Sequence, residues 1–324
     1  MGVTSPEASV AADLLVAALA QLDFPDVDPV TGGGERRSVR RRGERCQLVA
    51  AERGAGAYAM TAIAEADGVS RQTVFTTIGS KASRPVEVEP DRLAGVEKVI
   101  YTLWCTAGAD LLGAARALAD AGASRVQVNV VDDAVAPASQ RRIENHPPLP
   151  DAFVSLWLPT AHADTRGPVD SVVRNAAGHR ARVGAYLVTE SCPLANTAFP
   201  TPSGERTPGF AQIALLRRRA GQTSAEFLSA WLDDHTNVAL DTQDTFSYVQ
   251  NVVVRTLLPE GEPCEGIVEE CFPEAAMTDV HAFFDAVGDD ERLREHGEAM
   301  VASTSRFLDF DRLDVVPTSR YAFD

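Results

Sequence analysis

Two consecutive series of apolar runs divide residues 96–320, and both have the same order of elements. Runs rich in β-branched and aromatic residues predict four strands in the first series, at 96–105, 125–131, 152–158 and 182–190. Two stretches with helical periodicity lie between these runs, at 111–121 and 169–177. An irregular connection with two adjacent prolines fills residues 134–150. The first series therefore reads βαββαβ.

The pattern restarts after a proline-rich linker at residues 192–208. The second series predicts strands at 209–217, 246–255, 264–272 and 311–317, and helices at 224–240, 278–287 and after Gly288. Short words also recur at the equivalent second strand, where VQVNVV occupies 126–131 and YVQNVVV occupies 248–254. An internal repeat is the economical explanation of this agreement.

A βαββαβ unit folds as an antiparallel sheet that carries both helices on one face, so its other face needs a cover. Two such units in one chain can cover each other. The predicted fold class is therefore α+β: tandem ferredoxin-like βαββαβ repeats that form an intrachain α/β barrel, with a pocket between the sheets. We expect halves at 96–192 and 208–320 behind a short, partly disordered helical region at 1–90. Because the barrel closes within one chain, we expect a monomer or a weak dimer.

A helix-turn-helix pattern lies in the N-terminal region, at residues 60–82 (MTAIAEADGVSRQTVFTTIGSKA). A small residue stands where two helices would cross, a glycine permits the turn, and a serine can cap the second helix. The segment resembles the DNA-binding part of TetR-family regulators, which implies that its second helix lies in the major groove. The resemblance would place four residues at DNA: Arg71, Gln72, Thr73 and Lys81.

The TetR resemblance stops at this motif, because TetR regulators continue with an all-helical ligand domain and this chain continues with strands. Four explanations of the motif stay open. It belongs to a degraded or truncated regulator fused to another protein, or it results from a wrongly assigned start of the chain. Otherwise it is a chance helical hairpin, or part of a working regulator with the barrel as ligand sensor. The formal net charge of −16 argues against broad nucleic-acid binding, since a duplex-binding surface must neutralise phosphates.

The first helix of the second series carries the most specific pattern. Phe227, Trp231 and His235 follow at intervals of four residues, which is the buried stripe of an amphipathic helix. His235 is therefore expected on or beside the buried face. The second copy, with this stripe, resembles EthD-domain proteins of the dimeric α/β-barrel superfamily, which carry an aromatic residue, a Trp and a His at this spacing. The first copy reads LLGAARALADAG at the equivalent helix and resembles the fold only.

The EthD resemblance implies a cofactor-independent enzyme of oxidoreductase, dehydratase or cyclase/isomerase type that acts on a small apolar or aromatic molecule. His235 would be the proton shuttle, because an imidazole titrates near neutrality and can pass a proton either way. Phe227 and Trp231 would contact the substrate. In the structural alternative, His235 lies on the helix surface and bonds Asp233, Asp234 or a nearby backbone group. A non-catalytic binding protein, or an accessory partner of an oxygenase system, is the alternative function.

Polar residues embedded in two central strands of the second series are the remaining candidates. Gln250 and Asn251 point to opposite faces of their strand, as do Glu269 and Glu270, so one of each pair should face the lumen. We favour Asn251 and Glu270 as catalytic residues, with Tyr248 as an acid or hydroxyl donor and Gln250 as a substrate-binding residue. The alternative is that these side chains pair with one another or with Arg217 and Arg255 in hydrogen bonds at the barrel rim.

Composition constrains the compartment and the cofactors. Five scattered cysteines without a C-x-x-C pair indicate neither a disulfide framework nor a zinc site. No histidine pair has metal spacing, no glycine-rich run has a phosphate or dinucleotide pattern, and no G-x-S-x-G occurs, so we expect no cofactor and no metal. The sequence contains no apolar stretch as long as a membrane span and no basic signal-peptide start, which favours the cytoplasm.

Overall fold

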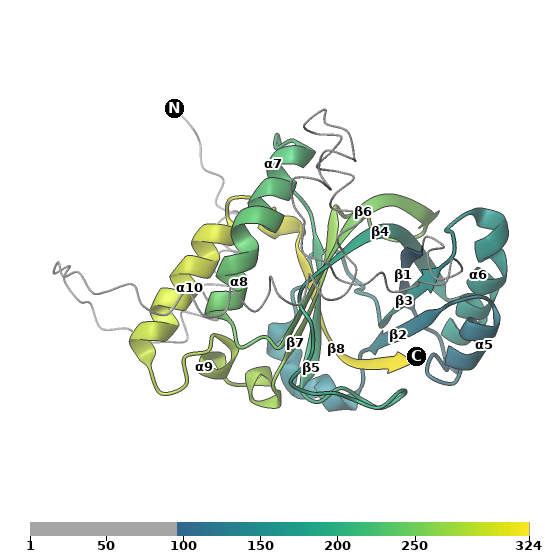
Figure 1. Ribbon diagram of the computed structural model, residues 1–324, viewed down its shortest axis with the longest axis horizontal. Helices are drawn as coiled ribbons and strands as arrows, with labels where there is room; N and C mark the ends of the chain where they lie inside the picture. The colour runs from purple at the N-terminus through teal and green to yellow at the C-terminus, as the bar shows by residue number, and fades with distance from the viewer. Residues whose placement is uncertain (1–95, 324) are drawn as a thin grey trace, which may run out of the picture. The chain divides into compact units, whose positions relative to one another are not determined.

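Eight antiparallel strands form one closed barrel in the computed structural model, which describes residues 96–323 (Figure 1). The strands are β1 (Glu97–Trp104), β2 (Arg125–Val130), β3 (Ala152–Leu158), β4 (Arg182–Leu194), β5 (Phe210–Leu216), β6 (Ser247–Pro259), β7 (Gly266–Phe272) and β8 (Asp314–Phe323). The helix-turn-helix motif, with Arg71, Gln72, Thr73 and Lys81, lies outside the described residues.

The order of strands around the barrel is that of two ferredoxin-like sheets joined edge to edge. The first half contributes β4-β1-β3-β2 and the second half β8-β5-β7-β6. Pairing of β2 with β8 and of β4 with β6 closes the ring. The predicted α+β class, with tandem βαββαβ repeats in an intrachain barrel, is confirmed.

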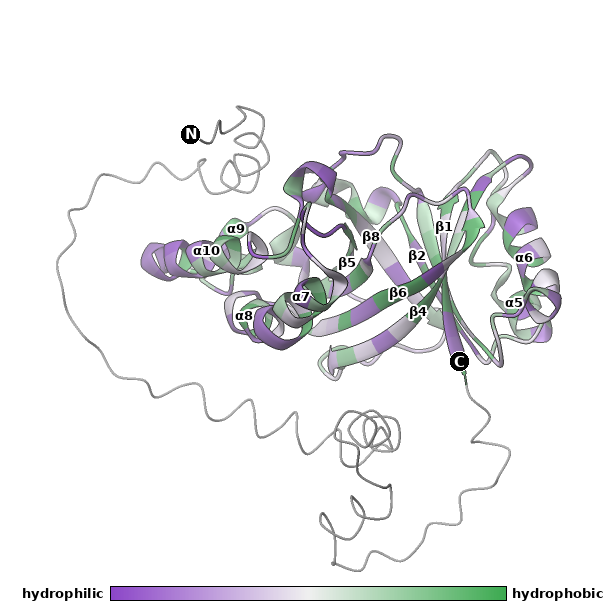
Figure 2. Ribbon diagram, turned by 90° about the horizontal axis from the view of Figure 1, so that it is seen from above, coloured by the Kyte–Doolittle hydropathy of each residue, from purple (hydrophilic) through white to green (hydrophobic). Residues whose placement is uncertain are grey.

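Helices cover two opposite flanks of the barrel (Figure 1). The first half carries α5 (Ala115–Asp120) and α6 (Ala163–Ala177) on one flank. The other flank is covered by elements of the second half: α7 (Ser224–Leu228), the π-helix η3 (Ser229–His235), α8 (Thr236–Thr242), α9 (Val280–Phe283) and α10 (Asp290–Thr304). Polar and apolar residues alternate along α6 and α10 in Figure 2, as helices that cover a sheet require.

Three short 3-10 helices complete the fold: η2 (Asp133–Arg141), η4 (Glu274–Met277) and η5 (Phe310–Arg312). η2 belongs to the connection between β2 and β3 that the sequence predicted as irregular. The predicted helix at 278–287 is reduced to α9, because the chain turns at Asp285, which has a φ of 50°. β8 starts later than predicted because η5 occupies the preceding residues.

The interior of the barrel is filled by side chains from both halves. Ile100, Phe153 and Tyr186 of the first half pack there with Ile213 and Ile267 of the second half. Two further apolar clusters lie between each half's sheet and its own helices. The layer between sheet and helices in the second half is therefore distinct from the space inside the barrel.

Within residues 96–323, no helix has the combined length and apolar character that crossing a membrane requires.

Candidate functional site

A cavity of about 180 Å³ lies in the second half, between the helix-facing side of its sheet and the helices that cover it. Most of its lining is apolar or aromatic, and the polar side chains that reach it include the imidazole of His235 and the carboxyl of Glu270. An apolar cavity of about 150 Å³ is large enough to admit benzene. The cavity can therefore hold an aromatic ring. It lies outside the barrel interior, so the predicted location between the two sheets is corrected.

His235 ends a π-helical turn, η3, that interrupts the long helix predicted at 224–240. π-Helical turns have i→i+5 hydrogen bonds and are frequent at functional sites. Here the turn carries Trp231 and His235 together on the cavity wall. The hydroxyl of Thr236 donates to the carbonyl of Leu232 over 2.8 Å just after the turn. The sequence predicted the helix and its buried stripe, and the π turn was not foreseen because its hydrogen bonding leaves no sequence signature.

The imidazole of His235 is buried, and a hydroxyl group of α10 orients it. Its Nδ1 lies 3.0 Å from Oγ of Ser303 on α10, and its ring centroid lies 5.1 Å from that of Phe307. Burial lowers the pKa of His235 to about 4, so the ring is neutral at physiological pH. The surface alternative is wrong, since the side chain is only 7% exposed and the neighbouring Asp234 pairs with Arg306 instead.

Glu270 is a buried carboxyl that has no cationic partner within residues 96–323. It lies on β7 opposite Tyr248 of β6, and both side chains line the cavity. Its nearest donor is the amide of Gln212, with Nε2 3.5 Å from Oε2, the limit of a hydrogen bond. Burial raises the pKa of Glu270 to about 8, so most of the carboxyl groups are protonated at neutral pH. A protonated carboxyl can donate a proton, which an ionised one cannot.

The aromatic candidates form the wall around these two groups. Trp231 and Tyr248 line the cavity, while Phe227 lies behind Trp231 with ring centroids 5.5 Å apart. Burial, and then the nearby Glu270, raise the pKa of Tyr248, so it stays a neutral phenol. Gln250 faces the same helices but does not reach the cavity. Its amide Nε2 donates to Oγ1 of Thr236 over 2.8 Å.

Asn251 lies on the opposite face of β6 from Tyr248, inside the barrel. The β6–β7 register pairs Tyr248 with Glu270 and Asn251 with Ile267, which puts Asn251 on the same face as Glu269. Nδ2 of Asn251 donates to Oε1 of Glu269 over 3.0 Å. Asn251 therefore faces the lumen, as predicted, whereas the preference for Glu270 over Glu269 as the lumen-facing glutamate is wrong. The two residues belong to different faces of the sheet.

Glu269 has a structural environment that contrasts with that of Glu270. Its Oε1 lies 2.8 Å from Nζ of Lys98, which also contacts Glu190 at 2.6 Å. The amide of Gln127 donates to the second oxygen. Burial alone would raise the pKa of Glu269, but the charge and hydrogen bond of Lys98 hold it below its ordinary value. Glu269 is thus a paired carboxylate, whereas Glu270 has no ion pair among the described residues. The bond of Glu269 with Asn251 agrees with the structural alternative, but its cationic partner is Lys98 and not Arg217 or Arg255.

The cavity is covered by the β2–β3 connection of the first half, which the sequence did not place near the site. Nε of Arg141 donates to the carbonyl of Ala276 over 2.9 Å, and Gln140 donates to the carbonyl of Thr278 over 3.1 Å. Farther along, Ile143 exchanges two backbone hydrogen bonds with Val315 of β8. Arg141 and Arg142 both line the cavity. Their position depends on contacts between distant residues, which a local pattern cannot reveal.

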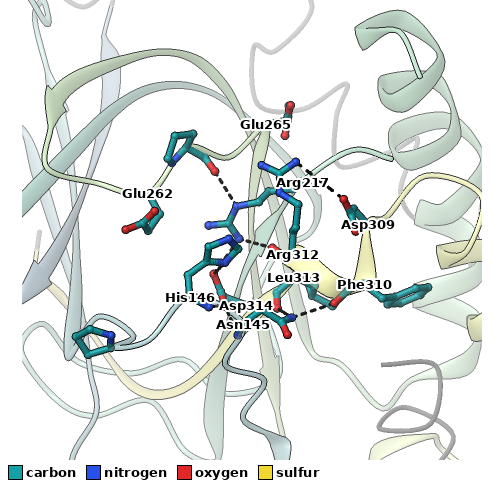
Figure 3. Close-up of polar contacts among 12 residues, drawn as sticks. Asn145, His146, Arg217, Glu262, Glu265, Asp309, Phe310, Arg312, Leu313 and Asp314 are labelled. Carbon is teal, nitrogen blue, oxygen red and sulfur yellow. Dashed lines mark hydrogen bonds and ion pairs between the residues drawn. The ribbon is translucent and has the colours of Figure 1, made fainter. Parts of the chain in front are cut away.

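A buried ion pair fixes the end of this connection (Figure 3). Asp314 accepts from the backbone N–H groups of Asn145 and His146 over 2.8 and 3.0 Å, and lies 2.9 Å from Nδ1 of His146. Nη1 of Arg217 donates over 2.8 Å to Oδ2 of Asp314, the same oxygen that Nδ1 of His146 contacts. We call these four residues the Asp314 clasp. It holds the connection from the first half against β5 and β8 of the second.

The described residues contain no group of three or more His, Cys, Asp and Glu side chains arranged to hold a metal ion.

Comparisons with known proteins assign no family to the chain. No known family's sequence profile matches it, and no curated protein matches it. The solved structures that resemble it include two of low identity. An anthrone oxidase-like protein is 10% identical, with a TM-score of 0.39, over 70% of this chain and 92% of its own. A protein of Fusobacterium nucleatum named as a monooxygenase is 6% identical, with a TM-score of 0.38, over 71% and 92%. The EthD resemblance stays a prediction.

Proposed function

We propose that the chain is an enzyme that moves protons on a small apolar or aromatic carbonyl compound bound in the second-half cavity. The observation that carries the proposal is that two complementary groups line one largely apolar cavity, one on the helices and one on the sheet. His235 is a neutral imidazole, and Glu270 is a carboxyl that has no cationic partner among the described residues. One can accept a proton and the other can donate one at the same pH, which is the arrangement that acid–base catalysis requires.

The roles follow from the hydrogen bonds. Nδ1 of His235 is engaged with Ser303, so Nε2 is the ring nitrogen available to a ligand. Nε2 can act as a base only in the tautomer in which Nδ1 carries the proton. In that tautomer the N–H group of Nδ1 donates a hydrogen bond to Oγ of Ser303. Nε2 would then take a proton from the carbon next to a carbonyl group while the carboxyl of Glu270 protonates the carbonyl oxygen. The product is an enol, and the reverse steps restore the ketone.

Reversible enolisation predicts hydrogen exchange without net reaction. The full-length protein in D₂O should replace the α-hydrogens of 1-indanone, a neutral aromatic ketone, with deuterium faster than buffer does, as followed by NMR. H235Q and E270Q should each slow the catalysed exchange by about 100-fold or more, the usual size of an acid–base contribution.

Matched controls separate this result from general damage to the fold. H281Q removes a histidine that bonds Asp290 outside the cavity, and E260Q removes a carboxylate that pairs with Arg174 on the other half. Both should exchange as fast as wild type. Absence of exchange in the wild type, or equal exchange in H235Q, E270Q and the controls, would contradict the proposal. Binding without exchange would indicate a carrier protein instead.

A further inference from the structure

The cavity opens to solvent beside two consecutive arginines of the first half. Gln140 and Arg142 are exposed, Phe310 is half-buried, and all three line the cavity, so this side is its mouth. His235 and Glu270 lie on the buried side. A ligand that enters must therefore pass the arginines before it reaches the groups proposed to transfer protons.

Arg141 is held in place by neutral groups. Its Nε and Nη2 donate to the carbonyls of Ala276 and Asp279 over 2.9 and 3.1 Å, and its guanidinium carbon lies 4.3 Å from the ring centroid of Phe283. Burial lowers the pKa of Arg141 to about 10, against the opposing effect of the nearby Asp279 charge, so the group keeps its charge at neutral pH. Carbonyl oxygens and an aromatic face orient this cation, and no carboxylate among the described residues forms an ion pair with it.

Arg142 is more exposed and has one loose ion pair. Its Nε lies 3.5 Å from Oε2 of Glu144, and both side chains are about one-third exposed. Exposed pairs of this kind are weak. No hydrogen bond from its two terminal nitrogens is found within the described residues, so these donors are available to a ligand.

The charge of the lining contrasts with that of the whole chain. The ionisable side chains on the cavity wall, apart from the phenol of Tyr248, are Arg141, Arg142, His235 and Glu270. With His235 deprotonated and Glu270 protonated, the wall carries two positive charges in a chain whose formal charge is −16. A cleft lined by one sign of charge concentrates ligands of the opposite sign.

The arginines have a fixed position relative to the cavity. The Ile143–Val315 bridge follows Arg142 directly, and the Asp314 clasp begins two residues later at Asn145 (Figure 3). Both tie the connection to β8, whose Val315 itself lines the cavity. A positively charged mouth built on such anchors is preorganised, and preorganisation lowers the cost of binding.

The geometry points to an aromatic ligand with one anionic group, a carboxylate or a phenolate, which lies against Arg141 and Arg142 at the mouth while its ring occupies the cavity. This inference rests on the proposed function, because it names the substrate class of the same site. The acid and base reach the ring end of the ligand, and the arginines select its charged end.

Two probes of nearly equal shape test the inference. 2-Naphthoate and its neutral counterpart 2-naphthamide should be titrated calorimetrically into the full-length protein. The wild type should bind the carboxylate at least about tenfold more tightly at low salt, and added salt should reduce this preference. R142Q should reduce the preference for the carboxylate several-fold, because only Arg141 then remains at the mouth. R142K should keep most of the preference, and R116Q, which removes an exposed charge on α5, should leave it unchanged.

Equal affinity for the two probes in the wild type, or the same ratio in R142Q and R116Q, would overturn the inference. Its failure is distinguishable from failure of the proposed function, because 1-indanone is neutral and its exchange does not depend on charge recognition. If the protein exchanges the hydrogens of 1-indanone but binds the two naphthalene probes equally, only the inference about an anionic ligand is refuted. A preference for naphthoate without exchange would remove the catalytic proposal and leave a binding site for aromatic anions.

Discussion

E270Q should make the protein more stable at neutral and alkaline pH and change its stability little in acid. Burial raises the pKa of Glu270 from 4.5 to about 8. Between these values the folded protein keeps the proton and the unfolded chain releases it. The folded state thus binds more protons than the unfolded state, so the stabilising effect of the protonated form is lost as pH rises. A glutamine has nearly the shape of the protonated carboxyl and does not titrate.

The magnitude follows from the two pKa values. Within this window the free energy of unfolding changes by about 1.4 kcal/mol per pH unit for one proton. From about pH 5.5 to about pH 7.5, Glu270 should therefore lower wild-type stability by roughly 2 to 3 kcal/mol. E270Q should lack this loss, so the difference between variant and wild type should shift in favour of the variant by that amount.

Urea unfolding at the two pH values, followed by tryptophan fluorescence, measures this difference. E260Q is the matched control, because its carboxylate is paired with Arg174 and largely solvated. Its difference from wild type should stay nearly constant between the two pH values. If the difference for E270Q is also constant with pH, Glu270 is ionised in the folded protein at neutral pH. The assignment of Glu270 as a proton donor would then be refuted.

Two further stability predictions concern His235 and Asp314. Because burial lowers the pKa of His235 from 6.5 to about 4, the unfolded chain gains a proton first as pH falls, so wild-type stability should drop by about 3 kcal/mol across that interval. Urea titrations at the two ends of this pH interval should show no such drop in H235Q. An equal drop in wild type and variant would contradict the assignment of His235 as a buried neutral imidazole. D314N should cost about 3 to 5 kcal/mol, because it leaves the buried Arg217 without its counter-charge, whereas E260Q should cost less than about 1 kcal/mol. Equal losses in D314N and E260Q would show that the clasp does not stabilise the fold.

The repeated fold could be predicted because its signals are local. Each strand of the barrel is a run of β-branched or aromatic residues, and the runs fall in the same order twice. Once two ferredoxin-like sheets share a chain, closing them against each other is the arrangement that buries both apolar faces. The strand order around the barrel follows from that requirement. The path of the β2–β3 connection does not, because the Ile143–Val315 bridge and the Asp314 clasp link residues far apart in sequence.

The candidate site was predictable only in part, for a reason visible in β6 and β7. Alternation along a strand shows that Glu269 and Glu270 face opposite ways, but only the register with β6 shows which of them shares a face with Tyr248. Burial does not separate the two glutamates, since each is 6% exposed. The distinguishing residue is Lys98 of β1, a buried lysine in a largely apolar strand, and it pairs with Glu269. A buried lysine requires an anionic partner, so the lysine of β1 is the sequence feature that could have identified Glu269 as the paired glutamate.

The two halves contribute different parts of the proposed site although they share one fold. The helix of the first half is short and rich in alanine, and its Leu118 packs against its own sheet. The helix of the second half brings Trp231 and His235 to the cavity through a π turn. The first half supplies the β2–β3 connection, which covers the cavity and carries Arg141 and Arg142. The proposed proton transfer and the proposed charge recognition thus come from different copies of the repeat, so the complete site depends on the pairing of the halves that closes the barrel.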